Sequence, residues 1–187
     1  ESDSDWMKRA QGYADQDVGE AAKLGSRIHD ALDQSFDGVE CPEELKCYVT
    51  PTLEWLKDKG IVMREREIVV VKNSEGYAGR VDAIATGKGG TNFILDFKTR
   101  RTKAGQKIVP YDGQAAQTAA YAAAYFSLDT PEDFIEKRIW GANLYISTTE
   151  MGRIEGRIST PPPRKTTQAP EPVKAEAKGS GSAVAFN

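Results

Sequence analysis

The residues best suited to chemistry lie at positions 93–98, in the segment FILDFK. Its β-branched and aromatic content is typical of a strand, in which alternate side chains share one face. Asp96 and Lys98 are therefore predicted to lie side by side, on the face opposite Phe97. A carboxylate beside an ammonium group is either an ordinary exposed ion pair or part of a site that acts on phosphate.

A second carboxylate comes from residues 79–85, a segment with similar strand character. If the two strands pair as a hairpin, Asp82 lies near Asp96. Two close carboxylates repel each other and resist ionisation, and a divalent cation that binds both removes the repulsion. Such a cation can activate water, while Lys98 stabilises charge on phosphorus. This combination favours hydrolysis of a phosphodiester bond.

The only histidine, His29, lies beside an apolar stripe of helical spacing. The stripe consists of Ala21, Leu24, Ile28, Leu32 and Phe36. A lone histidine in such a place is most often a structural residue. A nitrogen ligand is nevertheless compatible with Mn²⁺ as well as Mg²⁺, so His29 is a candidate third ligand.

The helices and strands that position these residues are predicted from the spacing of apolar residues and from the residues that begin or end such elements. A helix is predicted to begin at Asp17, in a capping-box-like sequence, and a second helical region covers residues 42–59, with Pro51 kinking it or dividing it into two. In the strand that carries Asp82, Val81 is expected to share a face with Ala83. Three antiparallel strands are predicted at residues 67–71, 79–86 and 92–99. An alanine-rich helix follows at 112–128, then a short helix near residue 130. A terminal hairpin is predicted from strands at 138–148 and 153–159.

The 187 residues are 39% hydrophobic and 28% charged, fractions typical of a globular protein. One domain is expected over residues 1–159, followed by a disordered tail over 160–187 that is rich in Pro, Lys, Gly and Ser. No apolar run approaches the ~18–20 residues of a membrane span, and no secretory segment opens the sequence, so a cytoplasmic location is expected. Organellar targeting stays open, because the chain starts at Glu1 rather than methionine.

A net charge of −3 argues against a protein that coats DNA by charge alone, so contact with nucleic acid requires a local patch. One patch contains no acidic residue: Lys98, Arg100, Arg101, Lys103 and Lys107. It directly follows the strand of Asp96, which favours phosphate contact, although such loops are most often simply solvated. The two cysteines are too few to hold an iron–sulfur cluster or a zinc site.

Several segments, in order along the chain, resemble motifs of the RecB-like branch of the PD-(D/E)XK nuclease superfamily, especially phage and mitochondrial-type single-domain exonucleases. They are Gly25-Ser-Arg-Ile-His29, Gly76-Tyr-Ala-Gly-Arg-Val-Asp82, Asp96-Phe-Lys98 and Gln117-Thr-Ala-Ala-Tyr121. The resemblance implies an α/β, restriction-endonuclease-like fold with a mixed central β-sheet flanked by helices. Two departures are the absence of cluster-binding cysteines and a proline-rich tail where relatives often have another helix.

The resemblance also implies a role for each matching residue, around one or two Mg²⁺ or Mn²⁺ ions. The metal ligands are His29, Asp82, Asp96 and the backbone carbonyl of Phe97. The catalytic residues are Asp82, Asp96, Lys98 and Gln117. Tyr121 is implied to contact the DNA backbone. The position of the basic patch, rather than the resemblance, adds Arg100, Arg101 and Lys103 as DNA contacts. Glu67 resembles a glutamate that precedes the glycine strand in relatives, although Glu65 is an alternative two residues away.

These inferences together predict a metal-dependent deoxyribonuclease that acts as an exonuclease on single strands or ends, in replication, repair or recombination. The expected setting is a bacterial or phage-infected cell, and no protein partner is indicated. A non-catalytic nucleic-acid-binding module with the same fold is the alternative, but the presence of both Asp96 and Lys98 argues against it. A nucleotide phosphohydrolase would present longer acidic clusters on helices, which the sequence lacks.

Overall fold

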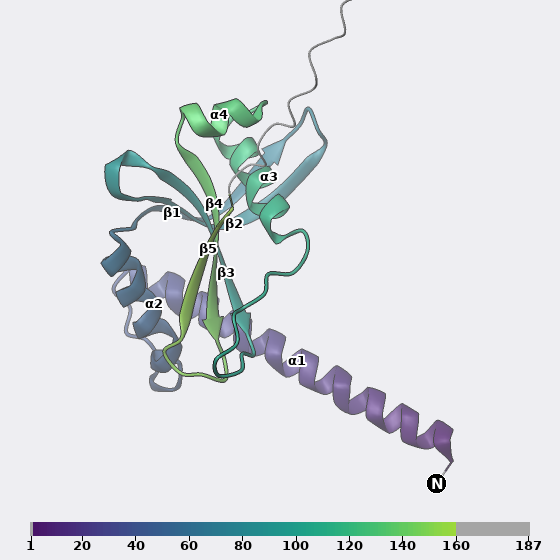
Figure 1. Cartoon of the computed structure of the whole chain (residues 1–187). Helices are drawn as coiled ribbons and strands as arrows, with labels where there is room; N and C mark the ends of the chain where they lie inside the picture. The colour runs from purple at the N-terminus through teal and green to yellow at the C-terminus, as the bar shows by residue number, and fades with distance from the viewer. Residues whose placement is uncertain (1, 160–187) are drawn as a thin grey trace, which may run out of the picture.

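The structure is a computed structural model, and it describes residues 2–159 (Figure 1). Five strands form one sheet in the order β1-β2-β3-β4-β5, and helices cover both of its faces. This arrangement confirms the predicted α/β fold with a mixed central sheet flanked by helices. The tail predicted over 160–187 lies outside the described residues. In the part of the chain that is described, no helix combines the length and apolar character needed to cross a bilayer.

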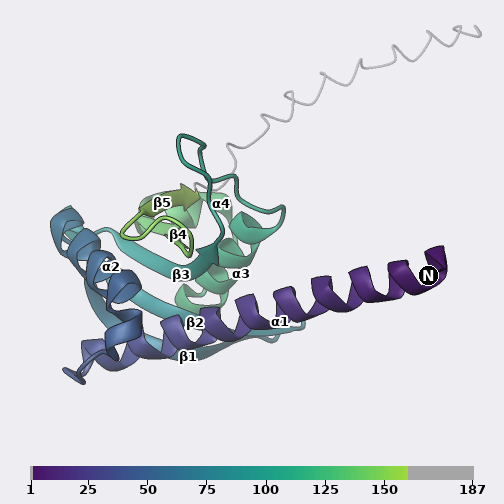
Figure 2. The same cartoon turned by 90° about the horizontal axis from the view of Figure 1, so that it is seen from below.

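Helix α1 (Asp3–Phe36) begins well before the predicted start at Asp17, so that prediction was wrong. Ser2 caps the helix by accepting a hydrogen bond from the backbone N–H of Asp5, and no proline breaks the chain between there and residue 17. Figure 2 shows the first half of α1 extending beyond the sheet and the second half lying along it. Ile28, on the second half, is fully buried against the sheet.

The second helical region is a 3₁₀ turn, Glu43–Leu45, followed by α2 (Lys46–Lys59). Pro51 lies inside α2 and does not divide it, so the predicted alternative of two short helices is wrong. The buried side chains Val49, Thr52 and Leu56 hold the helix continuous across the proline. Gly60 ends α2 at the expected place with a φ of 67°, a conformation in which glycine carries no side-chain penalty.

The sheet is mixed because only one pair of neighbouring strands is parallel. β1–β2, β2–β3 and β4–β5 are antiparallel, whereas β3–β4 is parallel. The strands are β1 (Val62–Lys72), β2 (Tyr77–Thr86), β3 (Asn92–Arg100), β4 (Ile139–Ser147) and β5 (Ile154–Ser159). The predicted three-strand meander and terminal hairpin are therefore confirmed, and the parallel join between them uses the intervening helices as its crossover.

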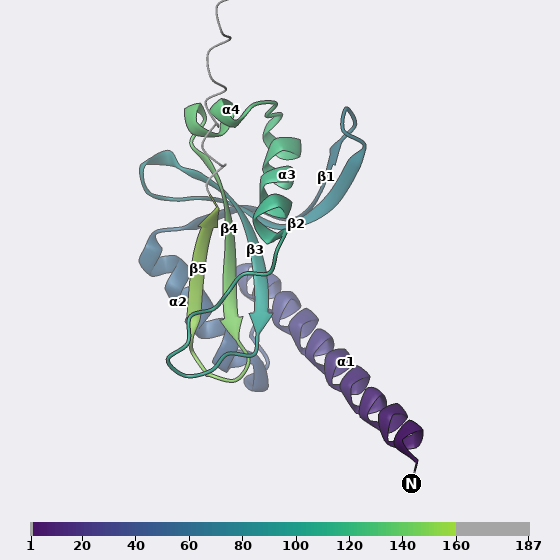
Figure 3. The ribbon, with the colours of Figure 1, turned by 45° about the vertical axis from the view of Figure 1, so that its right-hand side comes forward.

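Two helices of that crossover, α3 (Gln114–Phe126) and α4 (Pro131–Glu136), lie on the face of the sheet opposite α1 and α2 (Figure 3). α3 approaches the sheet closely at Gly141, where an added Cβ would lie 2.4 Å from the Thr118 hydroxyl. Two separate apolar cores result, one on each face. The α1-side core includes Ala83, Ala85, Leu95 and Phe97, and the α3-side core includes Val81, Ile84, Ile94 and Ala122.

The β2–β3 pairing stops halfway along the strands. The last pair in register is Ala83 with Leu95, and the strands separate beyond it. Val81 then lies in the α3-side core rather than with Ala83, which contradicts the prediction that they share a face. The alternation of side chains between the two faces of β2 breaks at Asp82. Glu67 lies opposite on β1, has a φ of 53° and is missing from the β1–β2 register. A local irregularity in the sheet thus creates a fork between β2 and β3.

Candidate active site

The fork between β2 and β3 opens into a cavity of about 540 Å³. Side chains from five elements line it: His29 from α1, Glu67 from β1, Asp82 from β2, Lys98 and Arg100 from β3, and Gln114 from α3. Residues far apart in the sequence therefore meet where the backbone ladder ends. We define this space as the fork cavity.

Asp82 takes over a backbone role at the fork. Its Oδ2 accepts a hydrogen bond from the backbone N–H of Phe97 at 2.7 Å, just beyond the last paired residues of β2 and β3. His29 Nδ1 lies 3.6 Å from the same oxygen. Burial raises the pKa of Asp82 to about 6, and the charge of Asp96 adds to the rise, although His29, the Phe97 N–H and Lys98 oppose it.

Asp96 is more deeply buried than Asp82, with 4% of its surface exposed. Lys98 Nζ lies 2.8 Å from Oδ1 and 2.7 Å from Oδ2, so the two side chains share one face of β3. Oδ2 is inaccessible to solvent, and its close approach to the Lys98 ammonium is an ion pair without hydrogen-bond geometry. Lys98 thus compensates the buried charge of Asp96, and a metal bound to this oxygen would have to share it with Lys98.

His29 reaches the cavity because α1 passes close to β3. Its ring packs edge-on against Phe97, with centroids 6.1 Å apart, and 27% of its side chain stays exposed. One turn earlier, a Cβ at Gly25 would lie 2.9 Å from Thr99 Oγ1. Glycine at this position therefore permits the approach that brings the imidazole beside Asp82.

The structure distinguishes the two candidate glutamates of β1. Glu67 lines the fork cavity and pairs with Arg80 at 2.5 Å. Glu65 instead accepts a hydrogen bond from the Tyr125 hydroxyl, a contact that raises the pKa of Tyr125 to about 12. A non-glycine residue at positive φ is strained, and such strain clusters at functional sites, which favours Glu67.

Gln117 and Tyr121 do not line the fork cavity. Gln117 Nε2 donates to the Tyr121 hydroxyl at 3.0 Å, and the Tyr121 ring covers Gly79, where an added Cβ would lie 2.2 Å from the ring. Gln114, one turn earlier, lines the cavity instead, and its Oε1 accepts from the Tyr145 hydroxyl at 2.7 Å. Gln114 was not predicted as a site residue, although its place on the same helical face as Gln117 was a signal for it.

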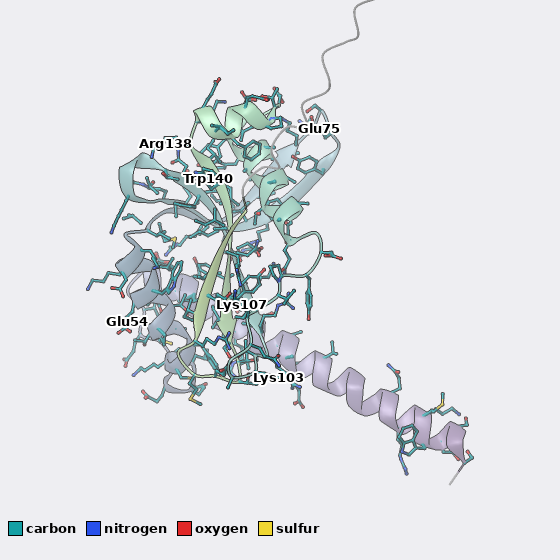
Figure 4. The ribbon with its side chains drawn as sticks, in the orientation of Figure 1. Glu54, Glu75, Lys103, Lys107, Arg138 and Trp140 are labelled. Carbon is teal, nitrogen blue, oxygen red and sulfur yellow. The ribbon has the colours of Figure 1, made fainter. Side chains whose placement is uncertain are left out.

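The basic patch is divided between the cavity and its surroundings. Arg100 lines the fork cavity, and Arg101 lines a neighbouring hollow beside α1. Lys103 and Lys107 lie farther along the loop after β3 and are exposed (Figure 4). Arg153 fixes this loop by donating to the backbone carbonyl of Lys103. Only the first residues of the patch are thus close to the candidate site.

The donor atoms at the fork suit a hard divalent cation. Carboxylate oxygens, a backbone carbonyl and one imidazole nitrogen are ligands compatible with Mg²⁺ or Mn²⁺. Within residues 2–159, however, no three His, Cys, Asp or Glu side chains are already arranged as a metal cage. Asp96 is turned to Lys98, and Asp82 is turned to the Phe97 N–H. The residue types fit a metal, and their side chains would have to reorient to bind it.

Comparisons with known proteins are limited to distant structural likeness. No family model matches the sequence, and no curated protein matches it. The structure of SSO0001 has a TM-score of 0.35 and 22% identity, covering 60% of this chain and 48% of that chain. The structure of Pyrococcus furiosus SfsA in complex with Ca²⁺ has a TM-score of 0.24 and 12% identity, covering 59% of each chain. This chain therefore spans less than two thirds of either protein, and we draw no functional conclusion from these likenesses.

Proposed function

We propose that this protein is a metal-dependent deoxyribonuclease that hydrolyses phosphodiester bonds, with a preference for single strands or ends. The observation that carries the proposal is the fork cavity itself. Lys98, Asp82 and His29 line it, although they come from three separate elements, and the buried Asp96 lies behind Lys98 as its ion-pair partner. Two acids, an amine and an imidazole at a gap in a sheet suit phosphate chemistry better than structural support.

The metal would be held by Asp82, Asp96, His29 and the backbone carbonyl of Phe97. Held by these residues, Mg²⁺ or Mn²⁺ would supply positive charge for the phosphoryl group and for activation of water. The raised pKa of Asp82, caused by burial and by the charge of Asp96, is a feature that a nearby cation would relieve.

Lys98 provides the positive charge that the chain itself contributes to the reaction. Its Nζ is held by Asp96, and 27% of the side chain is exposed. The amine can therefore also reach a ligand in the cavity. There it neutralises charge that develops on the phosphoryl oxygens. Gln114 can orient a water or the phosphate from the opposite wall, while Gln117 acts indirectly by holding Tyr121 against Gly79.

Recognition of DNA is proposed to depend on the backbone rather than on base sequence. Arg100 and Arg101 lie at or beside the cavity, and Lys103 continues the positive surface along the loop. Charged side chains of this kind contact phosphates without reading bases. The same proposal places the protein in DNA replication, repair or recombination.

A cleavage assay tests the proposal. The purified full chain is incubated with single- and double-stranded DNA labelled at the 5′ or 3′ end, in Mg²⁺, Mn²⁺ or chelator. We expect metal-dependent cleavage that Lys98→Ala abolishes, while Lys57→Ala, which removes an exposed charge on α2, leaves cleavage intact. The pattern of labelled products reports direction and strand preference.

Two results would count against the nuclease. Binding of DNA without cleavage in either metal would favour the non-catalytic nucleic-acid-binding module. Undiminished cleavage by a folded Lys98→Ala protein would exclude the role assigned to the fork cavity. Circular dichroism of each variant shows that the fold is retained.

A further inference from the structure

Arg100 is partly exposed, but two nitrogens of its guanidinium group are buried and have unused donors. Its Nε and Nη2 are both inaccessible to solvent, and neither has a hydrogen-bond partner in the described structure. Within residues 2–159, no carboxylate forms an ion pair with it either. Buried N–H donors without hydrogen-bond partners are costly, and they point to an anion that completes the site.

Aromatic rings hold this guanidinium in place. Its carbon lies 3.3 Å from the centroid of the Tyr111 ring and 5.8 Å from that of Tyr145. Cation–π contacts of this kind orient an arginine without using its N–H groups. The backbone is held as well, because Thr148 donates to the Arg100 carbonyl from both its N–H and its hydroxyl. The side chain is therefore positioned, and its Nε and Nη2 are unpaired but covered, so a phosphate reaches them only if the guanidinium or the Tyr111 ring shifts.

The neighbouring glutamine belongs to the same arrangement. Gln114 Oε1 accepts from the backbone N–H of Tyr111 at 3.0 Å and from the Tyr145 hydroxyl at 2.7 Å. Both tyrosines that flank Arg100 are thus tied to the start of α3. Arg100, Tyr111 and Gln114 all line the fork cavity.

The spacing along β3 relates Arg100 to the proposed catalytic pair. Residues two apart on a strand share a face and lie about 7 Å apart along it, so Asp96, Lys98 and Arg100 form one row. Successive phosphates of a nucleic acid strand have a comparable separation. A strand with one phosphate at Lys98 can therefore present the next phosphate to Arg100.

We propose that Arg100 binds a second phosphate of the substrate, one nucleotide from the phosphate that is cleaved. This inference rests on the proposed function for the identity of the substrate. The Nε and Nη2 edge of a guanidinium binds two oxygens of one phosphate side by side, a geometry that a lysine does not reproduce. The second phosphate is either the terminal phosphate of the strand or an internal one, and the chemistry of binding is the same.

Binding measured without metal tests this site separately from catalysis. The full chain is titrated in chelator, at fixed low salt, against a labelled single-stranded oligonucleotide that carries a 5′-phosphate, a 3′-phosphate or neither. We expect Arg100→Ala to weaken binding by at least about tenfold, the loss typical of hydrogen bonds to a charged group. Arg100→Lys should recover only part of that loss. Arg64→Ala, which removes an exposed arginine of β1 outside the fork cavity, serves as the control.

The oligonucleotides distinguish the source of the phosphate. If a terminal phosphate fills the site, its removal weakens wild-type binding and makes Arg100→Ala no worse than wild type on that oligonucleotide. If an internal phosphate fills it, Arg100→Ala costs the same affinity with or without the terminal group. Both outcomes support the proposal.

The proposal is overturned if the wild-type chain binds none of the oligonucleotides, or if Arg100→Ala and Arg100→Lys both bind each of them as Arg64→Ala does. Melting temperatures of all variants are measured, and Arg100→Lys carries the comparison if Arg100→Ala is unstable. Because the binding assay needs no cleavage, the nuclease function and the Arg100 phosphate site can be refuted independently. Phosphate binding that depends on Arg100, without nuclease activity, would refute the proposed function alone, whereas cleavage with no effect of Arg100 would refute this site alone.

Discussion

The two halves of the β2–β3 pair are built from the same strands but contrast in what they contain. In the paired half, the backbone ladder is complete between Ala83 and Thr86, and five of its side chains are apolar and buried: Ala83, Ile84, Ala85, Ile94 and Leu95. In the forked half, the β2–β3 ladder is absent, and the Asp82 carboxylate accepts the hydrogen bond of Phe97 N–H in its place. One half supplies stability, and the other exposes donors and acceptors that the backbone no longer uses.

The difference shows how a sheet can carry a polar site without losing its core. The fork leaves Phe97 N–H without a strand partner, and Asp82 accepts its hydrogen bond. The charge of Asp82 is disfavoured by burial there, as its raised pKa shows. Groups that destabilise the fold are retained most readily where function needs them, so the two halves should respond to substitution in opposite ways.

The largest effect is expected for Asp96→Asn, in the forked half. The change keeps the shape of the side chain but removes the charge that holds Lys98 and that the metal would use. We expect the rate of DNA cleavage to fall by about 10²–10³-fold or more, in line with the loss of one electrostatic group in other active sites. The matched control is Asp58→Asn, an exposed acid on α2, which should cleave like the wild type. Equal rates for the two variants would contradict the role of Asp96.

Leu95→Ala, one residue away in the paired half, should affect stability instead of chemistry. Leu95 is 2% exposed in the α1-side core, and truncation of such a side chain costs about 2–5 kcal/mol. Urea denaturation should show this loss in the free energy of unfolding. Cleavage measured well below the midpoint should stay within a few-fold of wild type. A large loss of activity in a fully folded Leu95→Ala protein would contradict the assignment of the paired half to stability alone.

The pH dependence of stability sharpens the contrast further. In metal-free protein, Asp82 has a pKa of about 6 against an ordinary value of 3.8, so its protonated form is favoured in the fold. Its contribution to stability is therefore fully present below pH ~3.8 and is lost as the pH rises through about 6. Asp82→Asn cannot ionise, and its amide oxygen can still accept from Phe97 N–H.

In chelator, Asp82→Asn should consequently gain stability relative to the wild type between pH 4 and 7. Two pKa units set an upper limit of about 3 kcal/mol, and partial exposure reduces it to roughly 1–2 kcal/mol. Thermal or urea unfolding at several pH values measures the difference. A difference that stays constant over this range, or a variant that loses stability as the pH rises, would show that burial does not control this carboxyl.

The smallest effect concerns the two glutamines of α3. Gln114 lines the fork cavity, whereas Gln117 bonds to Tyr121 over the β2 strand. We expect Gln114→Ala to lower the cleavage rate about five- to tenfold, the equivalent of one neutral hydrogen bond, and Gln117→Ala to lower it less. Rates of both variants under single-turnover conditions provide the measurement. The reverse order would favour the direct role that the family resemblance implies for Gln117.

Much of the architecture could be read from local patterns. β-Branched runs and the turns between them located all five strands, although β1 is longer than the predicted 67–71, and alternation placed Asp96 and Lys98 on one face of β3. Glycine at position 60 marked the end of α2, because a left-handed residue ends a helix with little cost when it has no side chain. These features depend on neighbours within a few residues, and so the amino-acid sequence determines them directly.

Features that depend on contacts between distant segments could not be read in this way. Nothing local signals that the β2–β3 ladder stops at Ala83 and Leu95, so the face of Val81 was assigned wrongly. The choice of Gln114 over Gln117 at the cavity is set by the position of α3 along the sheet, where Gly141 and Gly79 admit it closely. The sequence by itself determined which side chains are available for chemistry and which of them share a strand. Only tertiary packing decided which of them meet, because contacts across the whole sheet determine where the β2–β3 pairing ends and where α3 packs.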